Sequence, residues 1–101
     1  MNNSKCYERA IELRNQYSEE GSGAGALKIK ILGTLLLKLF ESNECLPESF
    51  DLVLPILNLI PYQEKTMGSL VSTVLNDLGY NDFRVVPYYL NRHTYSYKVH
   101  K

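Results

Sequence analysis

The sequence predicts an α+β domain, mainly α, in which three to four helices precede a C-terminal two-stranded antiparallel hairpin. Two observations predict it. Apolar residues recur every three or four positions in several segments before Gly79, as they do on one face of a helix. After that point Tyr95, Tyr97 and Val99 alternate with polar residues, which is typical of a half-buried strand. With 101 residues, 45% of them apolar, the chain can bury one core without disulfides or metals.

The first helix is expected at residues 5–19, capped by Asn3 or Ser4. Its apolar stripe is thin: Cys6, Ala10, Leu13 and Tyr17. A stripe of this kind has to be covered, and the sequence leaves two options open. Either the helix packs on its own domain, or residues 5–19 pair with a second copy and form a homodimer.

A glycine-rich segment follows this helix. Three glycines between positions 21 and 25 end a helix and make a hinge. The predicted organisation is therefore an N-terminal helix at 1–20 that serves as a dimerisation or partner arm, a hinge at 21–26, and a domain at 27–101. A phosphate-binding loop is not expected, because no Gly-Lys-Ser/Thr follows the glycines.

Two helical segments are expected in the middle of the chain. Residues 27–40 are the most hydrophobic stretch and should lie at the centre of the fold. A third helix should begin at Pro47 and use Phe50, Val53, Leu54 and Leu57 as its apolar face. Pro55 should kink it or split it into two short helices, and Pro61 should end it.

A fourth helix is expected at residues 66–78. Thr66 is its predicted cap, and Gly79 is placed to adopt the left-handed conformation after the last turn. The side chains expected on its outer face are small and polar: Ser69, Ser72, Thr73, Asn76 and Asp77.

The hairpin is expected to consist of strands 83–90 and 93–100, joined by a turn at Asn91-Arg92. Pro87 cannot donate a ladder hydrogen bond, so the first strand should be an edge strand or carry a bulge. The charge of the chain is concentrated here. Eleven basic and eleven acidic residues balance overall, but residues 1–80 carry −3 and residues 81–101 carry +3.

No catalytic or metal-binding constellation stands out, so neither an enzyme nor a cofactor is expected. His93 and His100 are seven residues apart, and an odd spacing on a strand points them to opposite faces. Cys6 and Cys45 do not form a CxxC pair and are expected to be reduced thiols. No signal peptide or membrane-spanning stretch is expected either, so the predicted location is the cytoplasm of a bacterium or of a phage-infected cell.

Tyrosine is unusually frequent, with eight residues in the chain. Tyrosine offers a large contact area with little side-chain entropy and is enriched where proteins bind partners. About half of these tyrosines are expected to cover the helical core. The candidate partner-binding residues are the four in the hairpin: Tyr88, Tyr89, Tyr95 and Tyr97.

The segment Thr66–Tyr80, with its Leu-Gly-Tyr ending followed by Arg84 and a basic hairpin, resembles the winged helix-turn-helix superfamily, including the modules of phage and plasmid replication proteins and small regulators. The resemblance covers about residues 27–101. It implies that the capped helix enters the major groove of double-stranded DNA and that the hairpin contacts the phosphate backbone. The residues that would bind nucleic acid are Ser69, Ser72, Thr73 and Asn76 on the helix, and Arg84, Arg92, His93 and Lys98 on the hairpin.

Two functions therefore remain open. The first is a small DNA-binding regulator or replication accessory. The second is a protein-interaction module, such as an inhibitor or adaptor of a host complex, that binds through the tyrosine-rich hairpin. The helix expected to read bases contains no Arg, Lys or Gln between Ser69 and Leu78, although these residues are the usual contacts to base edges.

Overall fold

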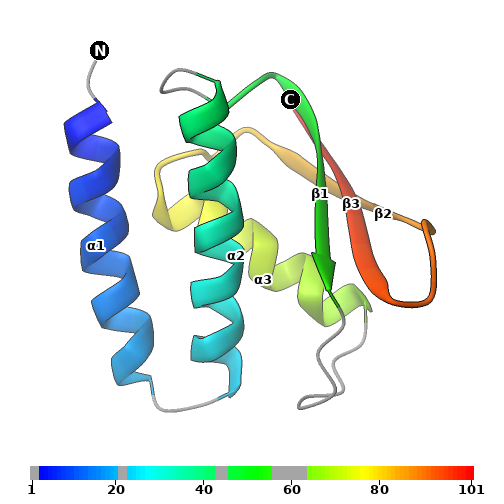
Figure 1. Cartoon of the computed structure of the whole chain (residues 1–101), viewed down its shortest axis with the longest axis horizontal. Helices are drawn as coiled ribbons and strands as arrows, with labels where there is room; N and C mark the ends of the chain where they lie inside the picture. Colours follow the sequence, from blue (N-terminus) through cyan, green and yellow to red (C-terminus); the bar gives the residue numbers. More distant parts are fainter. Residues whose placement is uncertain (1–2, 21–22, 43–45, 56–63) are drawn as a thin grey trace.

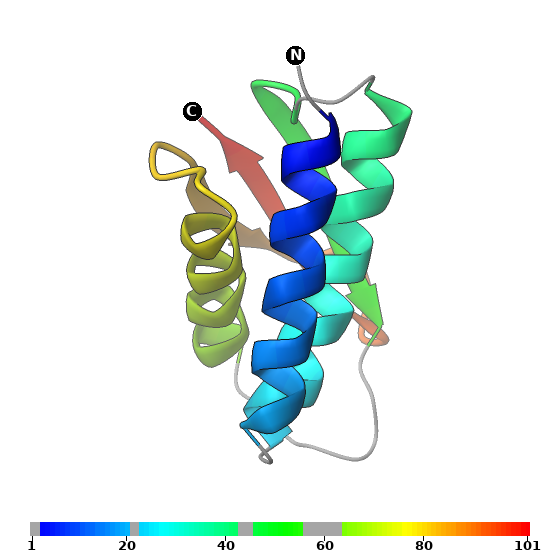
Figure 2. The ribbon, with the colours of Figure 1, turned by 90° about the vertical axis from the view of Figure 1, so that its left-hand side faces the viewer.

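The computed structural model of the chain describes residues 3–20, 23–42, 46–55 and 64–101. Within these residues the elements, in chain order, are α1 (Asn3–Glu19), α2 (Gly23–Glu41), β1 (Ser49–Pro55), α3 (Glu64–Asp77), β2 (Arg84–Tyr88) and β3 (Thr94–His100). The helices lie on one side of a three-stranded antiparallel sheet (Figures 1 and 2). The predicted α+β, mainly helical class is confirmed, but the sheet has one more strand than the predicted hairpin.

The additional strand is β1, and it corrects the prediction of a helix kinked at Pro55. Along β1 the buried side chains are Phe50, Leu52 and Leu54, whereas the residues between them are exposed. This alternation of period two belongs to a strand with one buried face. Pro55 therefore ends an edge strand and does not bend a helix. The rest of the predicted helix, including Leu57, lies outside the described residues.

The strand order is β1-β3-β2, with β3 in the centre. Pro87 therefore lies in an edge strand, as predicted from its missing donor. The antiparallel register places Val99 between Phe50 and Val85, and Tyr97 between Leu52 and Pro87. These rows form the inner face of the sheet, which packs against the helices.

The apolar stripe of α1 is covered by its own chain. Ala10, Leu13 and Tyr17 are buried, and α1 packs along α2. Of the predicted hinge, only residues 23–26 are described, and they form the first turn of α2. Gly25 is buried there, and a Cβ atom at this position would collide with the backbone carbonyl of Tyr17. A glycine is thus needed at position 25, because the backbone of α2 lies against the backbone of α1 there.

Helix α3 contributes Met67, Val71, Val74 and Leu75 to the core. It begins at Glu64, so the prediction that Thr66 caps it is wrong. Its end follows the prediction. Gly79 has φ = 101°, its amide donates to the Asn76 carbonyl at 2.9 Å, and the Tyr80 amide donates to the Leu75 carbonyl at 2.9 Å. This pair of hydrogen bonds is the Schellman motif, which satisfies the last carbonyl groups of a helix.

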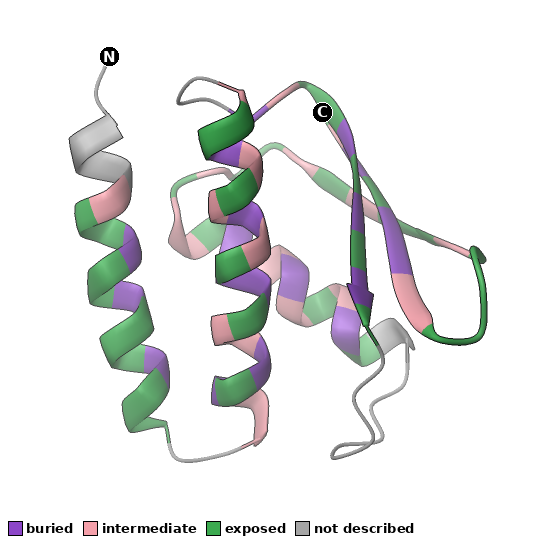
Figure 3. Ribbon diagram, viewed as in Figure 1, coloured by how far each residue is buried: buried purple, intermediate pink, exposed green. Residues whose placement is uncertain are grey.

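The core lies between the helices and the inner face of the sheet (Figure 3). No helix or strand among the described residues packs on the opposite face of the sheet. None of the helices in the described ranges has the length and apolarity that a membrane crossing requires.

Candidate binding surface

The uncovered side of the sheet is the first candidate site. Because successive side chains in a strand point to opposite faces, the residues between the core positions share this side. We call it the outer sheet face, and the strand registers assign to it Ser49, Asp51, Val53 and Pro55 of β1, Arg84, Val86 and Tyr88 of β2, and Thr94, Ser96, Lys98 and His100 of β3.

Apolar and aromatic side chains occupy the middle of the outer sheet face. Val53, Ser96 and Tyr88 form one row across the three strands. Val86 lies two residues before Tyr88 on the same face of β2. Val53 and Val86 are exposed, the latter by 45%. Ser96, between Val53 and Tyr88, is buried, and its hydroxyl is 3.1 Å from that of Thr94. The centre of this face is therefore apolar and well packed around one satisfied serine.

Charged residues border this apolar centre. Lys98 Nζ lies 2.8 Å from Asp51 Oδ1 on the neighbouring strand and 5.6 Å from the centroid of the Tyr88 ring. The hydrogen bond and the charge of Asp51 raise the pKa of Lys98. Arg84 and Arg92 form no ion pair with any residue in the described ranges. Of the three predicted Lys and Arg residues, Lys98 is thus neutralised by Asp51, whereas Arg84 and Arg92 are not neutralised by an ion pair in the described ranges.

The loop at residues 89–93, which we call the hairpin tip, joins β2 to β3 at one end of this surface. Tyr89 is 82% exposed and Leu90 51% exposed. Asn91 accepts a hydrogen bond at its Oδ1 from the His93 amide at 2.8 Å, a local turn that holds the loop. Arg92 and His93 are exposed beside them. The tip therefore presents an aromatic and an aliphatic side chain together with one cation.

The four predicted partner-binding tyrosines do not share one surface. Tyr88 lies on the outer sheet face and Tyr89 at the hairpin tip. Tyr97 is fully buried in the core, and Tyr95 is half-buried against the core. Tyr95 and Tyr97 therefore belong to the half of the tyrosines that cover the helices, and Tyr97 offers no surface to a partner.

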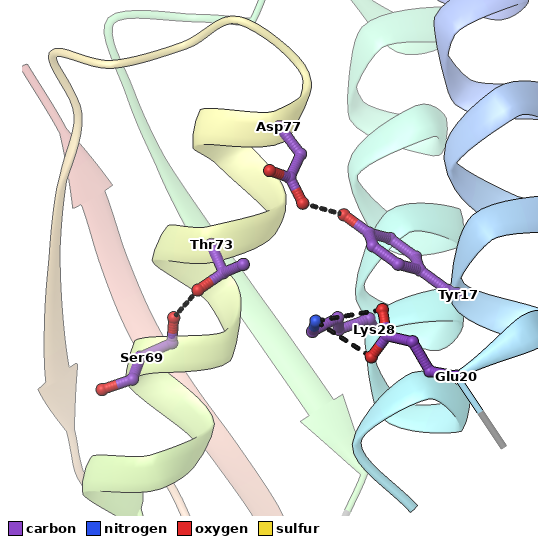
Figure 4. Close-up of polar contacts among 6 residues, drawn as sticks. All are labelled: Tyr17, Glu20, Lys28, Ser69, Thr73 and Asp77. Carbon is purple, nitrogen blue, oxygen red and sulfur yellow. Dashed lines mark hydrogen bonds and ion pairs between the residues drawn. The ribbon is translucent and has the colours of Figure 1, made fainter. Parts of the chain in front are cut away.

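The polar side of α3 lies away from the outer sheet face. Ser69 and Asn76 are exposed, whereas Ser72 and Thr73 are half-buried. The Thr73 hydroxyl donates to the Ser69 carbonyl at 2.9 Å (Figure 4). Because α3 packs on the inner face of the sheet, these residues and the pair Arg84 and Lys98 are on opposite sides of it. The structure thus separates the two groups that the winged-helix resemblance assigned to one DNA interface.

Helix α1 also contacts the C-terminal end of α3. The Tyr17 hydroxyl donates to Asp77 Oδ2 at 2.6 Å (Figure 4). Arg9 Nε donates to the Asp77 carbonyl at 3.0 Å. Burial and the hydrogen bond to Asp77 raise the pKa of Tyr17. Nearby, Lys28 Nζ lies 3.2 Å from Glu20 Oε1 and 5.1 Å from the Tyr17 ring centroid. The two contacts of Asp77 were not predicted, because they join residues that are 60 and 68 positions apart in the sequence.

Within the described ranges there is no group of three or more His, Cys, Asp or Glu side chains that could hold a metal ion. His93 precedes β3 and His100 ends it, so the two histidines are at opposite ends of the strand. The side chain of Cys6 and the whole of Cys45 are outside the described part of the structure.

Comparisons of the chain with family models, with curated proteins and with solved structures found no match. The function therefore has to be inferred from the surfaces themselves.

Proposed function

We propose that this chain is a small non-enzymatic binding module whose partner is a protein, and that it binds this partner through the outer sheet face and the hairpin tip. One observation carries the proposal: Val53, Val86 and Tyr88 lie on a side of the sheet that no helix in the described ranges covers, and the exposed Tyr89 and Leu90 follow Tyr88 in the hairpin tip. Apolar patches bordered by polar residues mark interaction sites, and aromatic residues at their centre provide most of the binding energy.

The charges of this surface indicate the chemistry of the partner. Arg84 lies beside Val86 on the outer sheet face and Arg92 lies in the hairpin tip, and neither forms an ion pair with a described residue. A partner with an apolar patch and acidic residues around it would complement both features. Arginine is also the cation that protein interfaces favour, since its planar group binds carboxylates with two parallel hydrogen bonds.

Binding to duplex DNA, the other function left open by the sequence, has less support. With Lys98 paired to Asp51, two unpaired cations remain at this surface. Two phosphate contacts would change the DNA affinity only roughly tenfold between 50 and 200 mM salt, whereas six to ten contacts change it about 10³- to 10⁵-fold. The exposed side of α3 adds no cation between Ser69 and Leu78.

Photo-crosslinking in the cells that naturally produce this protein tests the proposal. A photoreactive phenylalanine analogue replaces Val86 or Tyr89 in the full chain, and in a control it replaces Leu37, an exposed residue of α2. We expect the same discrete crosslinked partner protein from the first two positions, and we expect Leu37 not to give this product. The purified partner should then bind the Tyr89→Ala/Leu90→Ala variant at least about tenfold more weakly, and the Leu37→Ala variant as tightly as the original chain.

Fluorescence anisotropy with random duplex DNA at two salt concentrations tests the alternative function, which is binding to DNA. If the chain gives no discrete crosslink at Val86 or Tyr89, and binds duplex DNA with an affinity that falls on Arg84→Ala and Arg92→Ala, the protein-binding proposal is wrong and DNA binding takes its place. If the duplex does not bind at low salt, the DNA function is excluded.

A further inference from the structure

Helix α2 has a second apolar surface in addition to the one that faces the core. Ile29, Gly33, Leu36 and Phe40 recur at helical spacing on the side turned away from the sheet. Ile29 and Leu36 are half-buried and pack partly against the core, and Phe40 is 75% exposed. A surface helix of a globular domain normally has one apolar stripe and polar residues opposite it. A second stripe therefore indicates a contact outside the domain.

Helix α1 extends this surface. Ile11 is 62% exposed and lies beside the stripe, together with the half-buried Tyr7. The two helices enclose a shallow groove of about 330 Å³, lined by Tyr7, Ala10, Ile11, Arg14, Ile29, Leu32, Gly33 and Leu36. We call these residues, with Phe40, the helix face. Figure 3 shows the two helices side by side, with exposed and half-buried residues along both of them.

Gly33 gives the groove its depth. A Cβ atom added at this position would have no neighbouring atom within 4 Å, so open space lies above the backbone. The exposed Ile11 is a projecting side chain on the same face. In a twofold interface the same patch of each copy contacts the other, so the patch has to be self-complementary. A projecting Ile11 and a hollow at Gly33 on one surface meet this requirement.

The charges beside the groove favour a second copy as the occupant. The outer side of α1 carries the exposed acidic residues Glu8, Glu12 and Glu19, of which Glu12 is paired with Arg9, whereas the outer side of α2 carries the exposed Lys30. Lys30 forms no ion pair within the described ranges. A twofold axis parallel to the helices stacks α1 of each copy on α2 of the other, so the acidic side meets the basic side. The result is an antiparallel four-helix arrangement.

The size of the face sets the expected strength. A helix of 17 residues is about 25 Å long, and two such helices side by side cover a footprint of roughly 500 Å² in each copy. The buried total of roughly 1,000 Å² is at the lower limit for a specific interface. We therefore expect an association that is reversible and depends on concentration.

We propose that the helix face binds the helix face of a second copy, so that the chain forms a reversible, twofold-symmetric homodimer. Apart from Ala10, which lines the groove, the interface uses residues of α1 outside the predicted stripe, since Leu13 and Tyr17 are buried in the core. The proposal is independent of the function assigned to the outer sheet face, because the two surfaces share no residue.

Sedimentation velocity of the full chain from roughly 1 µM to 1 mM tests the dimer. We expect the mass to rise from that of one chain to that of two. Gly33→Glu puts a charge into the groove at a position with free space, so the variant should fold normally and remain monomeric at every concentration. Its circular dichroism checks the fold. The matched control, Val86→Glu, adds the same charge on the outer sheet face and should dimerise like the original chain.

A charge exchange tests the arrangement of the helices. Lys30→Glu should weaken association about fivefold, and adding Glu12→Lys to the same chain should restore it. A loss that the second change does not restore would overturn the stacking of α1 on α2. A chain that is monomeric at all concentrations overturns the proposal. If that monomer sediments with vesicles of anionic phospholipid, and Gly33→Glu does not, the helix face binds a membrane surface instead.

Discussion

The hydroxyl group of Tyr17 donates a 2.6 Å hydrogen bond to Asp77 Oδ2 and so joins α1 to the C-terminal end of α3. The ring of Tyr17 is buried, and its polar tip reaches the edge of the core. One side chain therefore provides both apolar packing and a specific polar contact between elements that are 60 positions apart. Two predictions follow from this pair, one on the hydrogen bond and one on pH.

Tyr17→Phe should lower the free energy of unfolding by about 1–3 kcal/mol, because it removes a hydrogen bond to a charged acceptor and keeps the ring. Tyr17→Ala should cost about 3–5 kcal/mol, because it also leaves a cavity. Urea denaturation measures both. Equal losses for the two variants would show that the hydrogen bond contributes the whole effect and the ring nothing, contrary to its burial.

Alkaline pH should destabilise the chain through the same residue. Burial and the bond to Asp77 raise the pKa of Tyr17 above the ordinary tyrosine value of about 10. Above pH 10 the unfolded chain loses this proton while the folded chain retains it, so the unfolding free energy should fall by up to about 1.4 kcal/mol per pH unit. Urea midpoints between pH 9 and 11 should decline less steeply for Tyr17→Phe than for the original chain. Parallel declines would exclude this role.

Local sequence patterns predicted α1, α2, the hairpin and the end of α3. Each of these rests on information within a few residues, such as the three-to-four spacing along α2 or the glycine that follows α3. Strand β1 was missed because Phe50 and Leu54 fit a helical spacing as well as a strand. Its pairing partner, β3, begins at Thr94, far along the chain. Only this distant pairing decides between the two.

The candidate surface was predicted in part. Sequence alternation grouped Tyr95 and Tyr97 on one face of β3, but it could not say which face the helices would cover. That depends on the additional strand and on where α2 and α3 pack. A sequence pattern does not indicate which side of a sheet a helix occupies. For this reason the sequence could not show that α3 and the pair Arg84 and Lys98 lie on opposite sides of the sheet.

Two glycines of α2 should respond to alanine in opposite ways. Gly25→Ala should destabilise the chain by about 1–3 kcal/mol, because the new methyl group collides with the Tyr17 carbonyl and pushes α1 away. Gly33→Ala should stabilise the folded chain by up to about 1 kcal/mol, because the site is open and alanine favours the helix. Thermal unfolding at a concentration where the chain is monomeric compares the two. A stabilising Gly25→Ala would contradict the close approach of α1 and α2.

Pro87 should protect the edge of the sheet from pairing with other chains. It lies in β2, an edge strand in which Val86 is exposed, and it cannot donate a ladder hydrogen bond. Pro87→Thr gives the edge another donor and a residue that favours strands, so we expect faster aggregation on incubation, measured by light scattering and thioflavin fluorescence. The urea midpoint should change little, since Pro87 is exposed.

Adding Val86→Lys to the same chain should suppress the aggregation, because a charge on an edge strand opposes pairing. If Pro87→Thr aggregates no faster than the original chain, the proline has no protective role.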